Sequence, residues 1–151
     1  MTSADSPPAF RERLLPGPWL FITLLLIVPA VMLTVTPIKA AIAPPVAIAA
    51  YVIIAGSLAL MAPVVTVADG QLTAGRARIP VTALGRIQVL DADALRAAIG
   101  PGLDARSYLL VRGYVHSGLR IEVTDPDDPA PYWIVTTRKP KSLAAAIEAA
   151  R

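Results

Sequence analysis

The 151-residue sequence predicts a membrane α-helical hairpin joined to an α+β domain that is mainly antiparallel β. Hydrophobic residues make up 55% of the chain and charged residues 17%, whereas soluble proteins contain about 45–50% apolar and about 25% charged residues. The apolar excess lies in the first half, where residues 14–38 and 40–68 carry no charge. From Val64 onward, short alternating segments and turn residues replace the long apolar runs.

The two uncharged stretches predict two transmembrane helices, because about 18 or more apolar residues are long enough to cross a bilayer. Flanking prolines narrow these helices to residues 19–36 and 46–62 within a membrane region 19–63, and Pro29 should kink the first helix. Residues 1–18 are then an N-terminal tail. A cleaved signal peptide is the alternative for the first helix, but its apolar region would span only about 7–15 residues.

Basic residues near the predicted helix ends indicate the orientation. Two arginines precede the first helix and three follow the second, whereas the connecting loop contains only Lys39. These arginines are Arg11, Arg13, Arg76, Arg78 and Arg86. Cytoplasmic ends of membrane helices collect Lys and Arg. We therefore expect a multi-pass protein of the plasma membrane with both termini in the cytoplasm and a short outer loop.

Residues 64–151 are expected to form one cytoplasmic domain of seven short strands and a C-terminal helix. The predicted strands cover residues 64–68, 71–74, 76–79, 85–90, 108–112, 119–124 and 132–137. Asp69-Gly70 suits a two-residue hairpin turn, and Asp91 and Asp93 suit the N-terminus of a helix at 94–99. The closing helix covers residues 140–150, with Leu143 and Ile147 on one face. Short turns between successive strands predict an antiparallel meander, the arrangement of pleckstrin-homology-like (PH-like) domains.

The sequence contains no catalytic or cofactor motif. It has no cysteine, no glycine-rich phosphate loop and no hydrolase signature. His116 is expected in a surface loop, and residues 125–129 (Asp-Pro-Asp-Asp-Pro) lack the Gly and Glu of a calcium loop and predict a turn. Tyr132 and Trp133 should face opposite sides of one strand, with one of them in the core. Because these motifs are missing, we expect no cofactor and no metal. A net charge of +3 is small for a nucleic-acid binder, so we also expect no nucleic acid.

Basic residues outside the apolar stretches could form a collar that faces anionic lipid. Its members would be Arg11, Arg13, Arg76, Arg78, Arg138, Lys139 and Lys141. Each basic residue close to an anionic membrane surface contributes about 1 kcal/mol of attraction. The alternative is that these are solvated charges that only set the orientation, because lipid-binding clusters usually hold about 4–8 basic residues close together.

Several segments resemble a family of actinobacterial two-pass membrane proteins, domain-of-unknown-function family 3093. They are Phe10–Leu14, Val89–Asp91, Gly100-Pro101, Tyr108–Leu110, Leu119–Val123, Asp125–Trp133 and Thr136–Pro140. The resemblance covers nearly all the chain after residue 9. Members often open the first helix with several tryptophans, whereas this chain has only Trp19. The resemblance implies two membrane passes and transfers no catalytic residue.

Together these features predict a membrane-anchored, non-enzymatic binding or scaffold protein. Its cytoplasmic domain would be presented to a protein partner or to anionic lipid headgroups, and a homo-oligomer is compatible with the sequence. The alternative is an accessory subunit of a larger membrane transporter or envelope complex that acts through its transmembrane helices. A third hypothesis is an enzyme that uses Asp91, Asp93 or His116.

Overall fold

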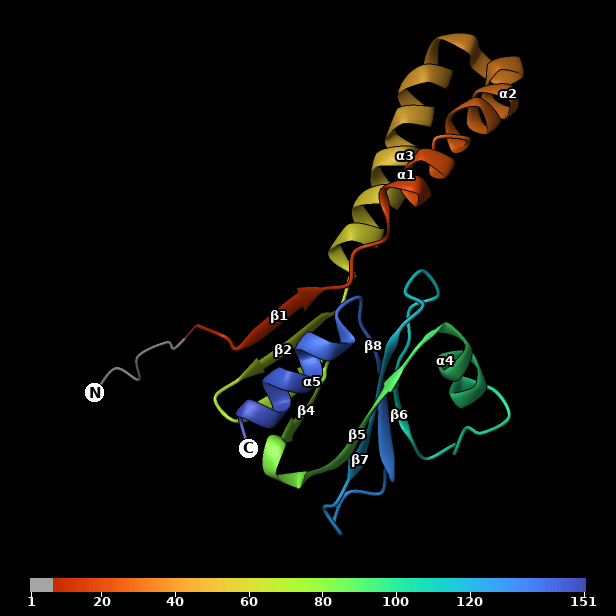
Figure 1. The fold of residues 1–151 in the computed structure, drawn as a ribbon. Helices are drawn as coiled ribbons and strands as arrows, with labels where there is room; N and C mark the ends of the chain where they lie inside the picture. Colours follow the sequence, from red (N-terminus) through yellow and green to blue (C-terminus); the bar gives the residue numbers. More distant parts are fainter. Residues whose placement is uncertain (1–6) are drawn as a thin grey trace. The chain divides into compact units, whose positions relative to one another are not determined.

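The computed structural model describes residues 7–151 and divides the chain into two compact units (Figure 1). A helical unit contains residues Leu15–Ala62. A β unit joins the described residues up to Leu14 with Pro63–Arg151. The helical unit is therefore inserted into the β unit, which the sequence did not predict. The predicted tail at 1–18 and the predicted domain start at 64 differ from these bounds, and residues 1–6 of that tail lie outside the described part.

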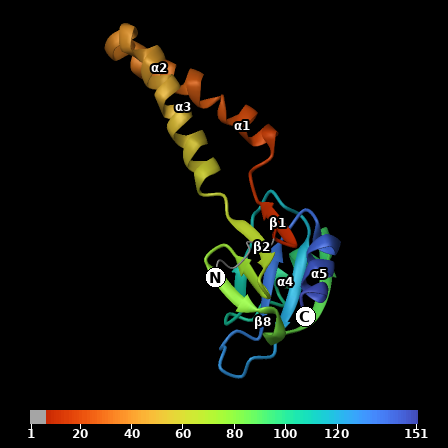
Figure 2. The same cartoon turned by 90° about the vertical axis from the view of Figure 1, so that its left-hand side faces the viewer.

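Three α-helices and a 3-10 turn make up the helical unit: α1 (Pro18–Leu24), α2 (Ile27–Lys39), η1 (Ala40–Ile42) and α3 (Ala43–Leu60). Helices α2 and α3 contact each other and lie side by side in both views (Figures 1 and 2). The Tyr51 hydroxyl of α3 donates to the Phe21 carbonyl of α1 at 3.4 Å. Within the helical stretch Pro18–Leu60, an 18-residue segment reaches a mean hydropathy of 2.4, and the stretch is long and apolar enough to cross a membrane.

The predicted bounds of these helices need correction. The first helix does not kink within 19–36 at Pro29 but is interrupted at Leu25 and Leu26, and α2 continues through Pro37 to Lys39. Pro29 lies in the first turn of α2, where its missing N–H leaves no helical hydrogen bond unmade. The second helix begins at Ala43, because Pro44 and Pro45 also suit a first turn.

The first sheet of the β unit has the order β1-β2-β3-β4, and all of its pairs are antiparallel. Its strands are β1 (Phe10–Arg13), β2 (Val64–Ala68), β3 (Gln71–Ala74) and β4 (Ala77–Pro80). The predicted turn at Asp69-Gly70 is confirmed by φ angles of 51° and 68°. Strand β1 is an eighth strand that the sequence did not predict, because its partner β2 lies beyond the whole helical unit.

The second sheet has the order β5-β7-β8-β6. Its strands are β5 (Leu84–Leu90), β6 (Tyr108–Leu110), β7 (Gly118–Val123) and β8 (Tyr132–Thr136). The prediction of a purely antiparallel meander is wrong for β6, which pairs with β8 in parallel. Helix α4 (Ala92–Ile99) separates β5 from β6, and the connection 111–117 passes the end of β8 to reach β7. Such a crossover allows parallel pairing, which a tight turn cannot make.

Both faces of the second sheet are covered, so the five residues of β8 are all buried. The closing helix α5 (Pro140–Ala149) contacts strands of both sheets and buries Leu143 and Ile147 completely, as predicted. Helix α4 covers part of the opposite face through a second cluster of Leu90, Leu95, Tyr132 and Ile134. The Asp91 carboxylate accepts a hydrogen bond from the Ala94 N–H at 2.8 Å and caps α4.

Gly118 is required for the close approach of β7 to β8. A methyl group at this position would lie 2.5 Å from the Val135 carbonyl oxygen. We predict that Gly118→Ala lowers the free energy of unfolding by about 1–3 kcal/mol, the usual cost of overpacking. Denaturant unfolding of the full chain in detergent, followed by Trp133 fluorescence in a Trp19→Phe background, measures the change. The control is Gly113→Ala, whose methyl group meets nothing within 4 Å; equal stability of the two variants would contradict the prediction.

Candidate functional site

The helical unit joins the β unit at one end of the first sheet, which we call the tether end. Here the Leu14 N–H donates to the Pro63 carbonyl at 2.9 Å, directly after β1 and directly before β2. The Glu12 carboxylate accepts hydrogen bonds from the Thr137 hydroxyl and from the Arg138 N–H, the latter at 3.1 Å. Glu12 thereby connects β1 to the segment between β8 and α5.

Two tyrosines also bind backbone atoms at the tether end. The Tyr114 hydroxyl donates to the Leu14 carbonyl at 2.7 Å, and the Arg138 guanidinium lies 6.0 Å from the centre of the Tyr114 ring. The Tyr108 hydroxyl donates to the Ala74 carbonyl at 2.7 Å and so connects the two sheets. This end of the β unit is therefore held by contacts between residues far apart in the sequence.

The predicted collar of seven basic residues separates into groups in the structure. Arg13, Arg76, Arg138 and Lys139 lie at the tether end, on strand ends and connections that meet there. Arg11 and Arg78 instead lie in one cross-strand row with Thr66 and Thr73, on the outer face of the first sheet. Lys141 is exposed in the first turn of α5.

Arg112 is a further basic residue at the tether end that the sequence analysis missed. Its N–H donates to the Thr136 hydroxyl at 3.2 Å, next to Thr137 and Arg138. The parallel pairing of β6 with β8 brings it there, because both strands then end at the same edge. An antiparallel meander would have placed Arg112 at the other edge, so no local signal in the sequence could identify it.

A polar groove of about 550 Å³ lies on the same face of the second sheet as α4, on the part of that face that α4 does not cover. Its lining comes from three strands and the residue before β8: Arg86, Gln88, Arg120, Glu122, Pro131 and Tyr132. The cross-strand register places Gln88 opposite Arg120 and Glu122 opposite Tyr132. The sequence did not predict this groove, because its lining depends on the pairing of β5 with β7 and of β7 with β8.

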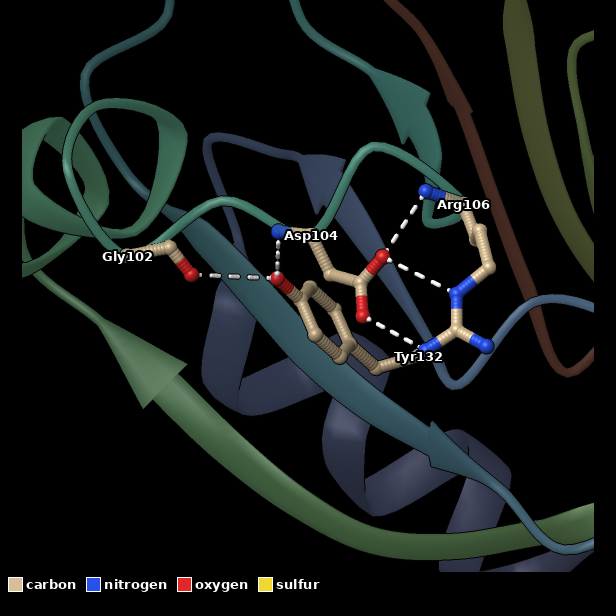
Figure 3. Close-up of polar contacts among 4 residues, drawn as sticks. All are labelled: Gly102, Asp104, Arg106 and Tyr132. Carbon is tan, nitrogen blue, oxygen red and sulfur yellow. Dashed lines mark hydrogen bonds and ion pairs between the residues drawn. The ribbon is translucent and has the colours of Figure 1, made fainter.

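Tyr132 is held in place at the edge of the groove (Figure 3). Its hydroxyl accepts a hydrogen bond from the Asp104 N–H at 2.7 Å and donates to the Gly102 carbonyl at 3.2 Å. The Asp104 carboxylate in turn pairs with the Arg106 guanidinium at 3.0 Å. The Arg120 guanidinium lies over the Tyr132 ring, 4.0 Å from its centre. Tyr132 therefore belongs to the second core cluster and supports an arginine of the groove.

These contacts lower the pKa values of Asp104 and Tyr132, and the Asp104 carboxylate raises the pKa of Arg106. The Arg106 side chain, followed by its backbone N–H, holds the pKa of Asp104 below its ordinary value. The pKa of Tyr132 is lowered first by the Ser107 hydroxyl and then by the Asp104 N–H, and the charge of Arg120 adds a smaller effect. The buried Ser107 Oγ makes no hydrogen bond of ordinary geometry within residues 7–151, so its O–H is free to turn towards the phenolate.

The other residues singled out in the sequence have structural roles or lie apart. His116 is exposed in the connection before β7. The predicted turn at residues 125–129 is confirmed, since the Asp125 carboxylate accepts from the Asp127 N–H at 3.0 Å and Asp128 from the Ala130 N–H at 2.8 Å. Trp133 packs in the main core with its ring 4.5 Å from that of Tyr108. Among the described residues, no three His, Cys, Asp or Glu side chains cluster as metal ligands.

Comparison with protein families assigns the chain to one family. The profile of a family described as "Protein of unknown function (DUF3093)" matches residues 9–147, and the chain belongs to this family. The match begins immediately before β1 and ends within α5, so it includes both compact units. No curated protein and no solved structure matches the chain significantly.

We predict that Tyr132 titrates below the ordinary pKa of a tyrosine and that Ser107→Ala raises its pKa. The serine hydroxyl stabilises the phenolate, so its removal favours the protonated phenol. The chain has four tyrosines, and the ring-carbon NMR shifts of labelled tyrosine follow each one with pH. Tyr132→Phe assigns the signal. An unchanged Tyr132 titration in Ser107→Ala would contradict the prediction.

Proposed function

We propose that this member of the DUF3093 family is a two-pass protein of the plasma membrane that acts as a non-enzymatic binding protein. Its β unit lies in the cytoplasm, has a PH-like arrangement, and faces the anionic membrane surface with its tether end. A protein partner would bind the surfaces that remain exposed. The pairing of β1 with β2 carries this proposal.

Because β1 and β2 are neighbours in one sheet, the helical unit must begin and end at the same place. Leu14 and Pro63, which flank it, are joined by a 2.9 Å hydrogen bond. A single membrane pass would separate these two residues by the hydrocarbon core, which is about 30 Å thick. An even number of passes keeps them together. The pairing thus supports two passes, with both connections on one side of the membrane.

Hydrogen bonding within the helices also supports a lipid environment. In an apolar solvent every polar group needs an internal partner. The hydroxyls of Thr23, Thr34, Thr36 and Ser57 all donate to carbonyls one turn earlier in the same helix. Many large apolar side chains of these helices are exposed, such as Leu33 at 77%, which suits contact with lipid. Helix α3 has 18 residues and is about 27 Å long, close to the thickness of the hydrocarbon core.

The strand order supports the PH-like arrangement. Four antiparallel strands form one sheet, β5, β7 and β8 form consecutive antiparallel pairs in the other, and a C-terminal helix packs against both. Helix α4 and strand β6 are an insertion between β5 and β7. This comparison concerns the fold alone and carries no activity with it.

Single cysteines test the two passes, because the natural chain has none. Ala41 is exposed in η1 between α2 and α3, and Gln71 is exposed in the first sheet. We predict that a membrane-impermeant maleimide labels Ala41→Cys but not Gln71→Cys in intact cells, and labels both after lysis. Labelling of both in intact cells would contradict the topology. Labelling of Gln71→Cys alone would contradict the orientation.

Hydrogen exchange tests the contact of the tether end with lipid. We predict that the full chain exchanges more slowly at residues 74–77 and 111–117 in nanodiscs of anionic phosphatidylglycerol than in phosphatidylcholine. Replacing Arg13, Arg76, Arg138 and Lys139 by Gln should abolish this difference, since it removes about 4 kcal/mol of attraction at about 1 kcal/mol per residue. The matched control replaces Arg11, Arg78, Arg96 and Lys141, which lie outside the tether end. Loss of the difference in both variants would contradict a specific role of the tether end.

A further inference from the structure

The groove on the second sheet holds two arginines with no acidic partner. Within residues 7–151, no carboxylate lies within 4.0 Å of the guanidinium of Arg86 or Arg120. This is notable because Glu122 lines the same groove and could have paired with either of them. A guanidinium has five N–H donors. The two side chains therefore present donors and positive charge to whatever enters the groove.

Arg120 is held in place before any ligand binds. Its guanidinium stacks at 4.0 Å on the Tyr132 ring, and Tyr132 is fixed by hydrogen bonds to the Asp104 N–H and the Gly102 carbonyl. Stacking on an aromatic ring leaves the edge of the guanidinium available for bidentate contacts with an oxyanion. A fixed side chain loses less conformational entropy when it binds. The groove therefore contains an oriented anion-binding group.

The lining also fixes the chemistry of a ligand. Phosphate or carboxylate oxygens suit Arg86 and Arg120, while the Glu122 carboxylate and the Gln88 amide carbonyl accept hydrogen bonds from an ammonium or hydroxyl group. A volume of about 550 Å³ lies within the range of small-molecule sites. We propose that this groove binds a small soluble molecule that carries a phosphate or carboxylate group next to an amine or hydroxyl donor.

The position of the groove favours a soluble ligand over a headgroup of the membrane. Strand β8 runs from Tyr132 in the groove to Thr136 at the tether end, a separation of about 13 Å at about 3.3 Å per residue. Glu122 pairs with Tyr132 and Arg120 with Ile134, so the groove extends from the far end of β8 to its middle and does not include the residues at the tether end. Only this step depends on the proposed membrane anchoring; the chemistry of the groove does not.

Calorimetry on the full chain in a neutral sugar-based detergent tests the proposal with O-phosphoserine as the probe. Inorganic phosphate and serine are the comparison ligands. We expect saturable binding of O-phosphoserine, weaker binding of phosphate and none of serine. Arg86→Gln and Arg120→Gln should each weaken O-phosphoserine binding about tenfold, since a charge-assisted hydrogen bond is lost. Arg120→Lys should give an intermediate loss, because it keeps the charge without the planar stack.

Glu122→Gln separates the two halves of the site. It should weaken the binding of O-phosphoserine, because the ammonium group of this ligand loses its partner. The binding of inorganic phosphate should be unchanged or tighter. Arg78→Gln, on the outer face of the other sheet, is the matched control. It should change neither the affinity for O-phosphoserine nor the affinity for inorganic phosphate. Absence of saturable binding of O-phosphoserine and phosphate, equal weakening by Arg78→Gln, or binding of a hexaglutamate peptide alone would overturn the proposal. The last result would indicate an acidic protein partner. None of these outcomes depends on the topology test.

Discussion

The pairing of β1 with β2 is the constraint on which the rest of the structure depends. Without it, Phe10–Arg13 would be part of a tail and the helices would simply precede a domain. With it, the helical unit becomes an insertion within a sheet, and both of its ends are held by strands of a folded unit. The buried Phe10 opposite Val67 supplies apolar contact for this pairing, and Glu12 supplies polar contact through Thr137 and the Arg138 N–H.

The same pairing explains why basic residues from distant parts of the chain lie together. Arg13 ends β1, Arg76 lies in the turn after β3, and Arg138 follows β8. Glu12, Tyr108 and Tyr114 bind backbone or hydroxyl groups of other elements there, so the frame that carries these basic residues is held by hydrogen bonds. Side chains on such a frame lose less entropy on meeting a charged surface than those of a disordered tail.

Sequence reasoning predicted most of the β unit because its signals are local. The strands from Val64 onward, the turn at Asp69-Gly70, the cap at Asp91 and the buried face of α5 each depend on neighbouring residues. The errors concern pairings between distant residues. β1 has two exposed arginines around Glu12, which resembles a solvated tail until β2 is known to lie beside it. The position of Arg112 depends on the parallel pairing of β6, which has no local signal.

The groove, too, depends on pairings between distant residues that the sequence pattern does not show. Arg120 and Glu122 alternate with buried apolar residues on β7 and face away from the core, but such residues are usually only solvated. Helix α4 covers part of that face and leaves the rest open, and the connection after it fixes Tyr132 beneath Arg120. The five buried residues of β8 join the groove to the tether end and take part in both hydrophobic clusters of the β unit. The proposed membrane contact and the proposed ligand site therefore use different residues of one domain.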